Sequence, residues 1–226
     1  MLRKHPFIIG QYYHVYNRGV DKRIIFNNKY DYERFLMLLH LSNSSKPFVI
    51  EQLLNLQNME YVDIFKIDRG NILVSIGSWC LMPNHFHLLL REEVENGISQ
   101  FMKKLATGYA MYFNLKNERS GSLFQGPFKS KYIGNDNYMR KLFSYIHLNP
   151  LEIKYPSWKE NIKQDKINSK KFLSLYRYSS YLDYLGYERI EGNLINQNEF
   201  PKYFSNTKDF QDFVEGFTKI NEDIII

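Results

Sequence analysis

The fold is most constrained by two apolar segments, residues 72–81 and 85–91, which a Pro-Asn pair separates. Apolar side chains alternate along the second segment, so Phe86 faces one way while His85 and His87 face the other. Alternation with a period of two residues is typical of a strand buried on one side, and a short turn between two such strands makes a β-hairpin. The pattern therefore predicts an antiparallel sheet with two imidazoles on one of its faces.

The remaining segments extend this hairpin into an α+β fold. In chain order, the expected elements are a strand at 12–17, a helix at 31–41, the hairpin, a helix at 98–117, a strand at 124–133 and a helix at 135–148. This order predicts a ferredoxin-like (RRM-like) antiparallel sheet with helices packed on one face. We expect the other face of the sheet to be free for a ligand.

The domain boundary is expected where this pattern ends. Residues 1–150 hold all of the predicted elements, and the polar stretch 42–71 interrupts them as an insertion. Beyond Pro150 the pattern weakens into basic and polar sequence, followed by an amphipathic stretch. We therefore expect one domain at 1–150 and a helical C-terminal extension at 151–226.

Composition limits the partners and the compartment. The chain has 226 residues and a net charge of +6, which suits a polyanionic partner. Its 18 Tyr and 17 Phe add faces on which unpaired bases can stack, although most of them are expected in the core. A single cysteine, the lack of a signal-peptide core and the lack of an apolar run of roughly 18 residues favour a reduced, cytoplasmic setting.

The histidine pair has two interpretations. Two imidazoles on one face of a strand can hold a metal ion, but a third ligand must then come from elsewhere in the fold. The alternative is a pair of hydrogen-bonded histidines on the sheet surface. His14, which alternates with Tyr12 and Tyr16 on the first strand, is expected to be an ordinary packed histidine.

A second candidate group lies near the end of the helix at 135–148. Tyr145 and Asn149 are four residues apart, so a phenol and an amide point to the same side of the helix. Asn149 precedes Pro150, which disfavours helical geometry there, so we expect the pair in a fraying last turn. A buried tyrosine followed by a helix-ending asparagine would give the same pattern. His147 is expected to point away from Tyr145.

Taken together, the two motifs resemble those of the single-tyrosine (Y1) HUH transposases of the IS200 type. The blocks that carry the likeness are Pro83–His87, Tyr145–Pro150, Tyr13–Gly19 and Arg119–Lys129. The resemblance spans about residues 10–150, and the insertion at 42–71 is a departure from it. The tail around Tyr178–Tyr181 is similar to the REP-associated branch of tyrosine transposases.

The resemblance implies a metal-dependent DNA endonuclease and strand transferase that acts on single-stranded DNA with hairpins or palindromic repeats. In the family pattern, His85, His87 and Asn149 hold Mg²⁺ or Mn²⁺ at the scissile phosphate, and Tyr145 attacks it to leave a 5′ phosphotyrosine. Imidazole ligands favour Mn²⁺ over Mg²⁺. The family has monomers and homodimers, and the REP-associated branch favours the monomer. Such a protein would be bacterial and nucleoid-associated when bound to DNA.

Other residues compete for these roles or add to them. Tyr109, Tyr112 and Tyr138 lack an Asn or Gln four residues on, so core packing or base stacking is expected of them instead of nucleophilic attack. Basic residues near the sheet elements are the expected phosphate contacts. They are Arg18, Arg119, Lys129 and Lys131.

Two further functions compete with tyrosine-mediated cleavage. The same sheet resembles RNA-recognition folds, so the chain could bind hairpin DNA or RNA without cutting it. A metal phosphodiesterase in which water attacks is the third reading. The presence of both histidines together with Tyr145 and Asn149 favours the transposase-like reading.

Overall fold

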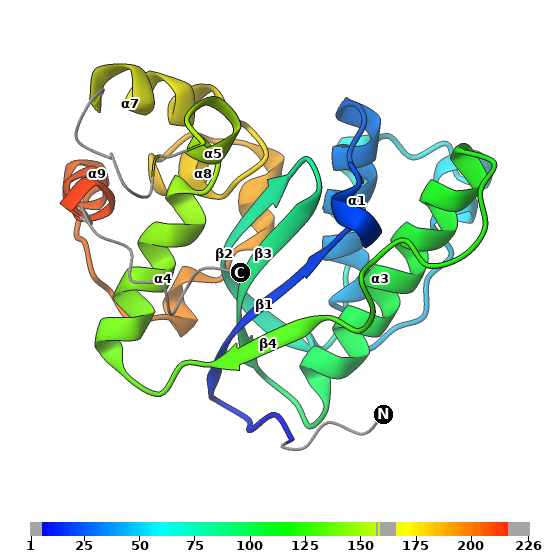
Figure 1. The fold of residues 1–226 in the computed structure, drawn as a ribbon. Helices are drawn as coiled ribbons and strands as arrows, with labels where there is room; N and C mark the ends of the chain where they lie inside the picture. The colour runs from blue at the N-terminus through cyan, green and yellow to red at the C-terminus, as the bar shows by residue number, and fades with distance from the viewer. Residues whose placement is uncertain (1–5, 157, 159–165, 217–226) are drawn as a thin grey trace.

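The computed structural model describes residues 6–156, 158 and 166–216. The outer ends of the two expected domains, residues 1–5 and 217–226, lie outside the described residues. A four-stranded antiparallel sheet in the order β2-β3-β1-β4 forms the centre (Figure 1). Its strands are β1 (Tyr12–Arg18), β2 (Val74–Met82), β3 (His85–Glu92) and β4 (Lys129–Tyr132).

One face of the sheet packs against α1 (Lys29–Ser42) and α3 (Gly97–Lys116). Phe86 of β3 is buried against Phe35 of α1, and their ring centroids lie 5.1 Å apart. The side chain of Asn28 accepts a hydrogen bond from the Tyr30 amide and so caps the start of α1. The predicted ferredoxin-like antiparallel sheet with helices on this face is confirmed.

The second face of the sheet is also covered, so the expectation that it is free is wrong. A second cluster of buried residues joins Leu89 of β3 to Phe143 on α4 (Asp136–Leu148) and to Phe210 from the C-terminal extension. Figure 1 shows α4 on the side of the sheet opposite α1 and α3, with the extension beyond it. The apolar face of α4 has to be buried somewhere, and the sheet supplies the surface.

The C-terminal extension is helical, as predicted. Its helices are α5 (Leu151–Lys154), α7 (Lys166–Leu175), α8 (Tyr181–Tyr184) and α9 (Thr207–Gly216), with 3₁₀ turns at Ile190–Leu194 and Gln197–Glu199. None of the helices in the described part of the chain has both the length and the apolarity that a membrane span requires.

The insertion is ordered around two short helical segments, a π-helix at Gln52–Leu56 and α2 (Tyr61–Ile64). Asn43 fixes the point where the insertion returns to the sheet. Its Oδ1 accepts hydrogen bonds from the amides of Leu73 and Val74, and its Nδ2 donates to the Val74 carbonyl. The insertion therefore rejoins the sheet in a defined register at the start of β2.

The fourth strand is shorter than the predicted 124–133. β4 covers only Lys129–Tyr132, and the chain before it meets β1 through an isolated bridge between Gly19 and Phe124. Gly126 has a φ of 114°, and Pro127 has no amide hydrogen to donate, so the ladder cannot continue through these residues.

Candidate active site

The two histidines of the hairpin lie side by side at one end of β3. The ring centroids of His85 and His87 are 5.0 Å apart, and the rings are nearly perpendicular at 89°. His87 is fully buried, while His85 is partly exposed. Phe86 between them points into the opposite core, as the alternation predicts.

Strand register brings the basic and aromatic side chains of β1 and β4 to the same face. Residues directly opposite one another in an antiparallel pair share a face of the sheet. The pairs that matter are Arg18 with His85, Tyr16 with His87, Lys129 with Tyr16 and Lys131 with His14. Of the four predicted phosphate contacts, the sheet therefore places three beside the histidine pair.

His14 joins the site through His87. The Nε2 atom of His14 lies 3.0 Å from Nδ1 of His87, and the two rings stack at 5.2 Å with an interplanar angle of 19°. Burial and, to a smaller extent, the positive charge of Lys131 together lower the pKa of His14 to about 3, so the ring is neutral. His14 is packed, as expected, but it packs on a candidate metal ligand. Its alternation with Tyr16 places the two on one face of β1, but the sequence does not give the register that brings His14 to His87.

Asn84 holds the other histidine of the pair. Its Oδ1 lies 2.6 Å from Nδ1 of His85, and its Nδ2 donates to the Lys22 carbonyl at 3.1 Å. The hairpin turn is fixed as well, because the carbonyl of Pro83 accepts hydrogen bonds from the amides of Ile25 and Phe26. Each candidate histidine ligand thus has a defined contact at Nδ1, which is how proteins orient imidazole ligands.

Tyr145 reaches the histidines from α4. Its ring centroid lies 5.3 Å from that of His87, edge to face at 86°, and 6.4 Å from that of His14. The side chain is 2% exposed. Burial raises the pKa of Tyr145 above its usual value, and the Asn149 amide offsets part of the rise, so the group is a neutral phenol at pH 7.

Asn149 follows directly on the last turn of α4. The main-chain N–H of Asn149 donates to the Tyr145 carbonyl at 2.9 Å. Its φ of −52° and ψ of −38° are helical, so the expected fraying before Pro150 does not occur. The side chain of Asn149 is buried, and its hydrogen bond with the Tyr145 side chain lowers the pKa of the phenol. A buried amide is costly unless its polar atoms have partners.

The donor set fits a divalent cation. Within the described residues, no group of three or more His, Cys, Asp and Glu side chains could hold a metal ion, so the carboxylates and thiol there supply no third ligand for His85 and His87. The side-chain amide oxygen of Asn149, four residues after Tyr145 at the end of α4, is the third ligand that the family resemblance implies. Two imidazoles and an amide oxygen suit Mn²⁺ better than Mg²⁺.

The side chains of the three rival tyrosines make other contacts. Tyr109 is buried in the core between the sheet and helices α1 and α3, and its hydroxyl donates to the Ile25 carbonyl. The hydroxyl of Tyr112 donates to Asp31 on α1. Tyr138 lies on α4, and the ammonium of Lys131 on β4 is 4.8 Å from the centre of the Tyr138 ring. These contacts match the packing roles expected from the sequence.

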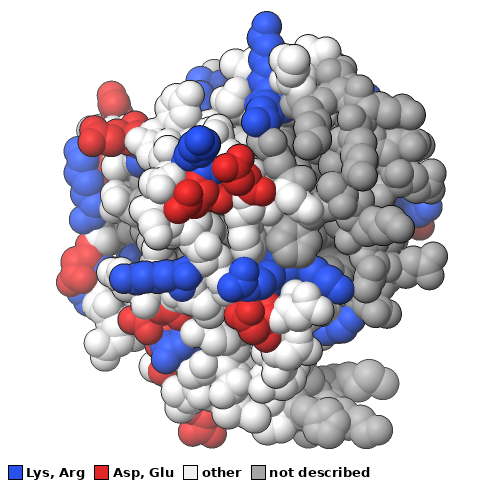
Figure 2. All heavy atoms as spheres, turned by 90° about the vertical axis from the view of Figure 1, so that its left-hand side faces the viewer, with Lys and Arg blue, Asp and Glu red and all other residues white. Residues whose placement is uncertain are grey.

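Arg119 lies apart from the other predicted phosphate contacts. It follows α3, where its guanidinium donates to the side chain of Asn114 and to the Ser122 carbonyl, which orders the turn after the helix. His147 points away from Tyr145, as expected, and lies 2.8 Å from the Ser180 hydroxyl. On the side where α4 and α9 lie, Figure 2 shows a band of Lys and Arg side chains with Asp and Glu directly above and below it.

Comparisons with known proteins identify the family and the fold. The family model described as "Transposase IS200 like" matches residues 10–149. Among solved structures, the chain is similar to a REP-associated tyrosine transposase bound to a REP hairpin, with 14% sequence identity, a TM-score of 0.50, and coverage of 91% of this chain and 99% of that one. At this identity the likeness concerns the fold. No curated protein sequence matches the chain. Because the family match spans more than half of its length, the protein belongs to the IS200-like transposase family.

Proposed function

We propose that the protein is a metal-dependent endonuclease and strand transferase that cuts single-stranded DNA near hairpins or palindromic repeats. The observation that supports this most is the contact between Tyr145 on α4 and His87 on β3. A phenol beside metal-binding imidazoles is what tyrosine attack on a phosphodiester needs. The similar solved structure holds a REP hairpin, which makes hairpin DNA the first substrate to test.

In this proposal, the Tyr145 hydroxyl oxygen attacks the phosphorus of the scissile phosphodiester, and the bond from phosphorus to the 3′ oxygen breaks. The 5′ phosphate stays on Tyr145, and the 3′ oxygen leaves as a hydroxyl after it takes up a proton. Strand transfer is the reverse step with a different 3′ hydroxyl. Because burial raises the pKa of Tyr145, its proton has to be removed as the new bond forms.

His85 and His87 would hold the divalent ion, Mn²⁺ or Mg²⁺, with Asn149 as the third ligand. Asn84 and His14 engage Nδ1 of the two rings, so the ligating nitrogen in this proposal is Nε2 of each. When bound, such an ion withdraws electron density from the phosphate and makes the phosphorus easier to attack.

Basic residues around the site would bind the DNA backbone. Arg18, Lys129 and Lys131 share the histidine face of the sheet, and Arg119 would contact phosphates at the end of α3. The cytoplasm, with association to the nucleoid when DNA is bound, is the location that this substrate requires.

A covalent trapping assay tests the proposal. We expect wild-type protein, incubated with Mn²⁺ and a labelled hairpin-flanked oligonucleotide, to form an adduct that survives denaturing electrophoresis. Tyr145→Phe should lower adduct formation by at least about 10³-fold, because phenylalanine has no nucleophilic oxygen. Tyr138→Phe, which removes a hydroxyl from the same helix, is the matched control and should retain activity.

The other readings give different results in the same assay. Binding of the hairpin without cleavage would make the protein a binding module. Cleavage without an adduct would point to attack by water, as in a phosphodiesterase. An adduct that persists in Tyr145→Phe would show that another residue is the nucleophile.

A further inference from the structure

A segment of the C-terminal extension, residues 176–191, runs along the outer edge of β2, and we call it the edge segment. The Leu81 amide donates to the Tyr178 carbonyl at 2.9 Å, and the Ser180 amide donates to the Trp79 carbonyl at 2.9 Å. Cys80 and Ser179 form an isolated antiparallel bridge between them. The edge segment therefore takes up the backbone groups that an edge strand would otherwise expose.

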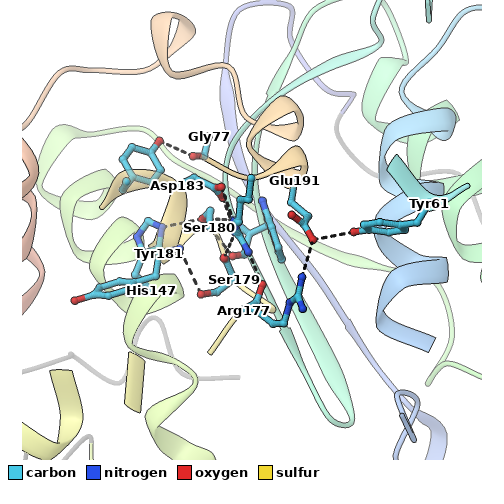
Figure 3. Close-up of polar contacts among 12 residues, drawn as sticks. Tyr61, Gly77, His147, Arg177, Ser179, Ser180, Tyr181, Asp183 and Glu191 are labelled. Carbon is cyan, nitrogen blue, oxygen red and sulfur yellow. Dashed lines mark hydrogen bonds and ion pairs between the residues drawn. The ribbon is translucent and has the colours of Figure 1, made fainter. Parts of the chain in front are cut away.

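The hydroxyl of Ser180 connects the edge segment to the helix that carries Tyr145. It accepts a hydrogen bond from the Trp79 amide at 3.0 Å and lies 2.8 Å from Nε2 of His147 on α4. Figure 3 shows His147 and Ser180 pointing toward one another. Both side chains are fully buried. One oxygen atom thus joins the main chain of β2 to a side chain of α4.

Arg189 holds the turn on which Ser180 sits. Its guanidinium binds both carboxylate oxygens of Asp183 at 2.7 Å and donates to the carbonyls of Arg177 and Ser179, both at 2.5 Å. The same cation lies 5.3 Å from the centre of the buried Trp79 ring. A planar guanidinium with bonds on three sides has little freedom to move, so the backbone around Ser180 is fixed.

The other end of the edge segment is anchored to the opposite side of the molecule. Glu191 accepts a hydrogen bond from the Tyr61 hydroxyl of α2 at 3.0 Å and lies 3.7 Å from the Arg177 guanidinium (Figure 3). Tyr178 stacks on Tyr32 of α1 with a centroid separation of 3.7 Å. The edge segment therefore ties the α1 layer to the α4 layer across the edge of the sheet.

The hydrogen bond between Ser180 and His147 affects Tyr145 because both His147 and Tyr145 lie on α4. Residues two apart on an α-helix are about 200° apart around its axis, so Tyr145 faces β3 while His147 faces the edge segment. A helix held on both sides resists rolling about its axis. Since a side chain reaches about 6 Å from the helix axis, a roll of roughly 10° would move its end by about 1 Å.

We propose that Ser180 and His147 are positioning residues, which hold α4 in the rotation that keeps the Tyr145 hydroxyl in line with the scissile phosphate. This rests on the proposed function, in which Tyr145 is the nucleophile. A displacement of about 1 Å at a reacting atom lowers rates by as much as about 100-fold, so the loss of this hydrogen bond slows the chemical step. DNA binding is unaffected, because neither buried side chain faces the basic surface of the sheet.

The test uses full-length protein and compares Ser180→Ala and His147→Phe with wild type. We expect each variant to form the covalent adduct about tenfold or more slowly at saturating hairpin DNA, with a DNA dissociation constant within about twofold of wild type. The double variant should be no slower than Ser180→Ala, because Ser180→Ala already removes the hydrogen bond that His147→Phe removes. Ser174→Ala on α7 removes an exposed hydroxyl that donates to the Lys171 carbonyl at 3.0 Å, and it should behave as wild type.

A second measurement needs no activity. Hydrogen exchange of the α4 amides should be faster in Ser180→Ala and His147→Phe than in wild type and Ser174→Ala. Wild-type adduct rates and wild-type exchange in both variants would overturn the positioning role. An equal loss of DNA binding and adduct formation would also overturn it in favour of a general structural role. If wild type itself forms no adduct, the proposed function fails, and the exchange data still decide whether Ser180 holds α4.

Discussion

At the residue scale, the candidate site is an arrangement of neutral groups in a dry environment. Burial lowers the pKa of His14 to about 3 and raises that of Tyr145, so neither the imidazole nor the phenol is charged at pH 7. The positive charges are placed beside them, on Lys131 of β4 and Arg18 of β1. The charged groups of the site therefore lie on β1 and β4, and the two buried rings avoid the cost of holding charge themselves.

The two histidines of the hairpin should determine the affinity for the metal ion and have little effect on the affinity for DNA. We expect His85→Ala and His87→Ala each to lower the affinity for Mn²⁺, measured by calorimetry, by about tenfold or more and to abolish adduct formation. Hairpin affinity should stay within a few fold of wild type, because phosphate contacts come from other residues. His40→Gln, a change to a buried histidine of α1, is the control for loss of an imidazole. Unchanged Mn²⁺ affinity in both alanine variants would contradict the metal assignment.

At the element scale, the local patterns predicted most of the site-bearing elements closely. The helix expected at 135–148 is α4 at Asp136–Leu148, and the strand expected at 85–91 is β3 at His85–Glu92. These elements have strong periodicity and clear ends, such as the cap in which the Asn135 side chain accepts from the Tyr138 amide. The proposed nucleophile and the proposed metal ligands could therefore be named from the sequence.

What could not be predicted depends on contacts between distant segments. The hydrogen bond between His14 and His87 requires the register of β1 against β3, and no local pattern sets that register. The bond between His147 and Ser180 joins residues 33 positions apart across an extension with weak periodicity. The covered second face was missed for the same reason, because α4 is buried between distant strands of the sheet and residues of the extension.

The junction between the hairpin and α3 is sensitive to a single methyl group. A Cβ atom at Gly97, the first residue of α3, would lie 2.2 Å from the Leu73 carbonyl oxygen, which is main chain and cannot rotate away. We expect Gly97→Ala to lower the free energy of unfolding by about 1–3 kcal/mol in urea titrations. Gly216→Ala, at a position in α9 with no atom within 4 Å of the added group, should change it by less than about 0.5 kcal/mol. Equal stability of the two variants would show that the main chain at Leu73 shifts to accommodate the added methyl group.

At the scale of the whole molecule, buried histidines in separate layers should make stability depend on pH. Burial and, to a smaller extent, the positive charge of Arg69 in the insertion together lower the pKa of His40 to about 4. The unfolded chain, with an ordinary histidine pKa of 6.5, then binds more protons than the folded chain between those two values. Stability is therefore complete above about pH 6.5 and is lost as the pH falls toward 4.

Urea unfolding at several pH values checks this. We expect the urea concentration at the unfolding midpoint to be lower at pH 5 than at pH 7.5. His40→Gln should make this midpoint depend less on pH, because glutamine does not titrate. His14 and His147, whose pKa values burial lowers to about 3, should keep part of this dependence in that variant. A midpoint that is constant over this range would contradict the neutral, buried state of these rings.

The covered edge of β2 also affects how copies of the chain can meet. Because residues 178–180 already occupy the outer hydrogen-bonding groups around Trp79 and Leu81, a second copy cannot lengthen the sheet by adding a strand there. The opposite edge is β4, a strand of four residues on which Lys129 and Lys131 are exposed. Two such edges would bring like charges together, which disfavours the pairing of two copies through β4.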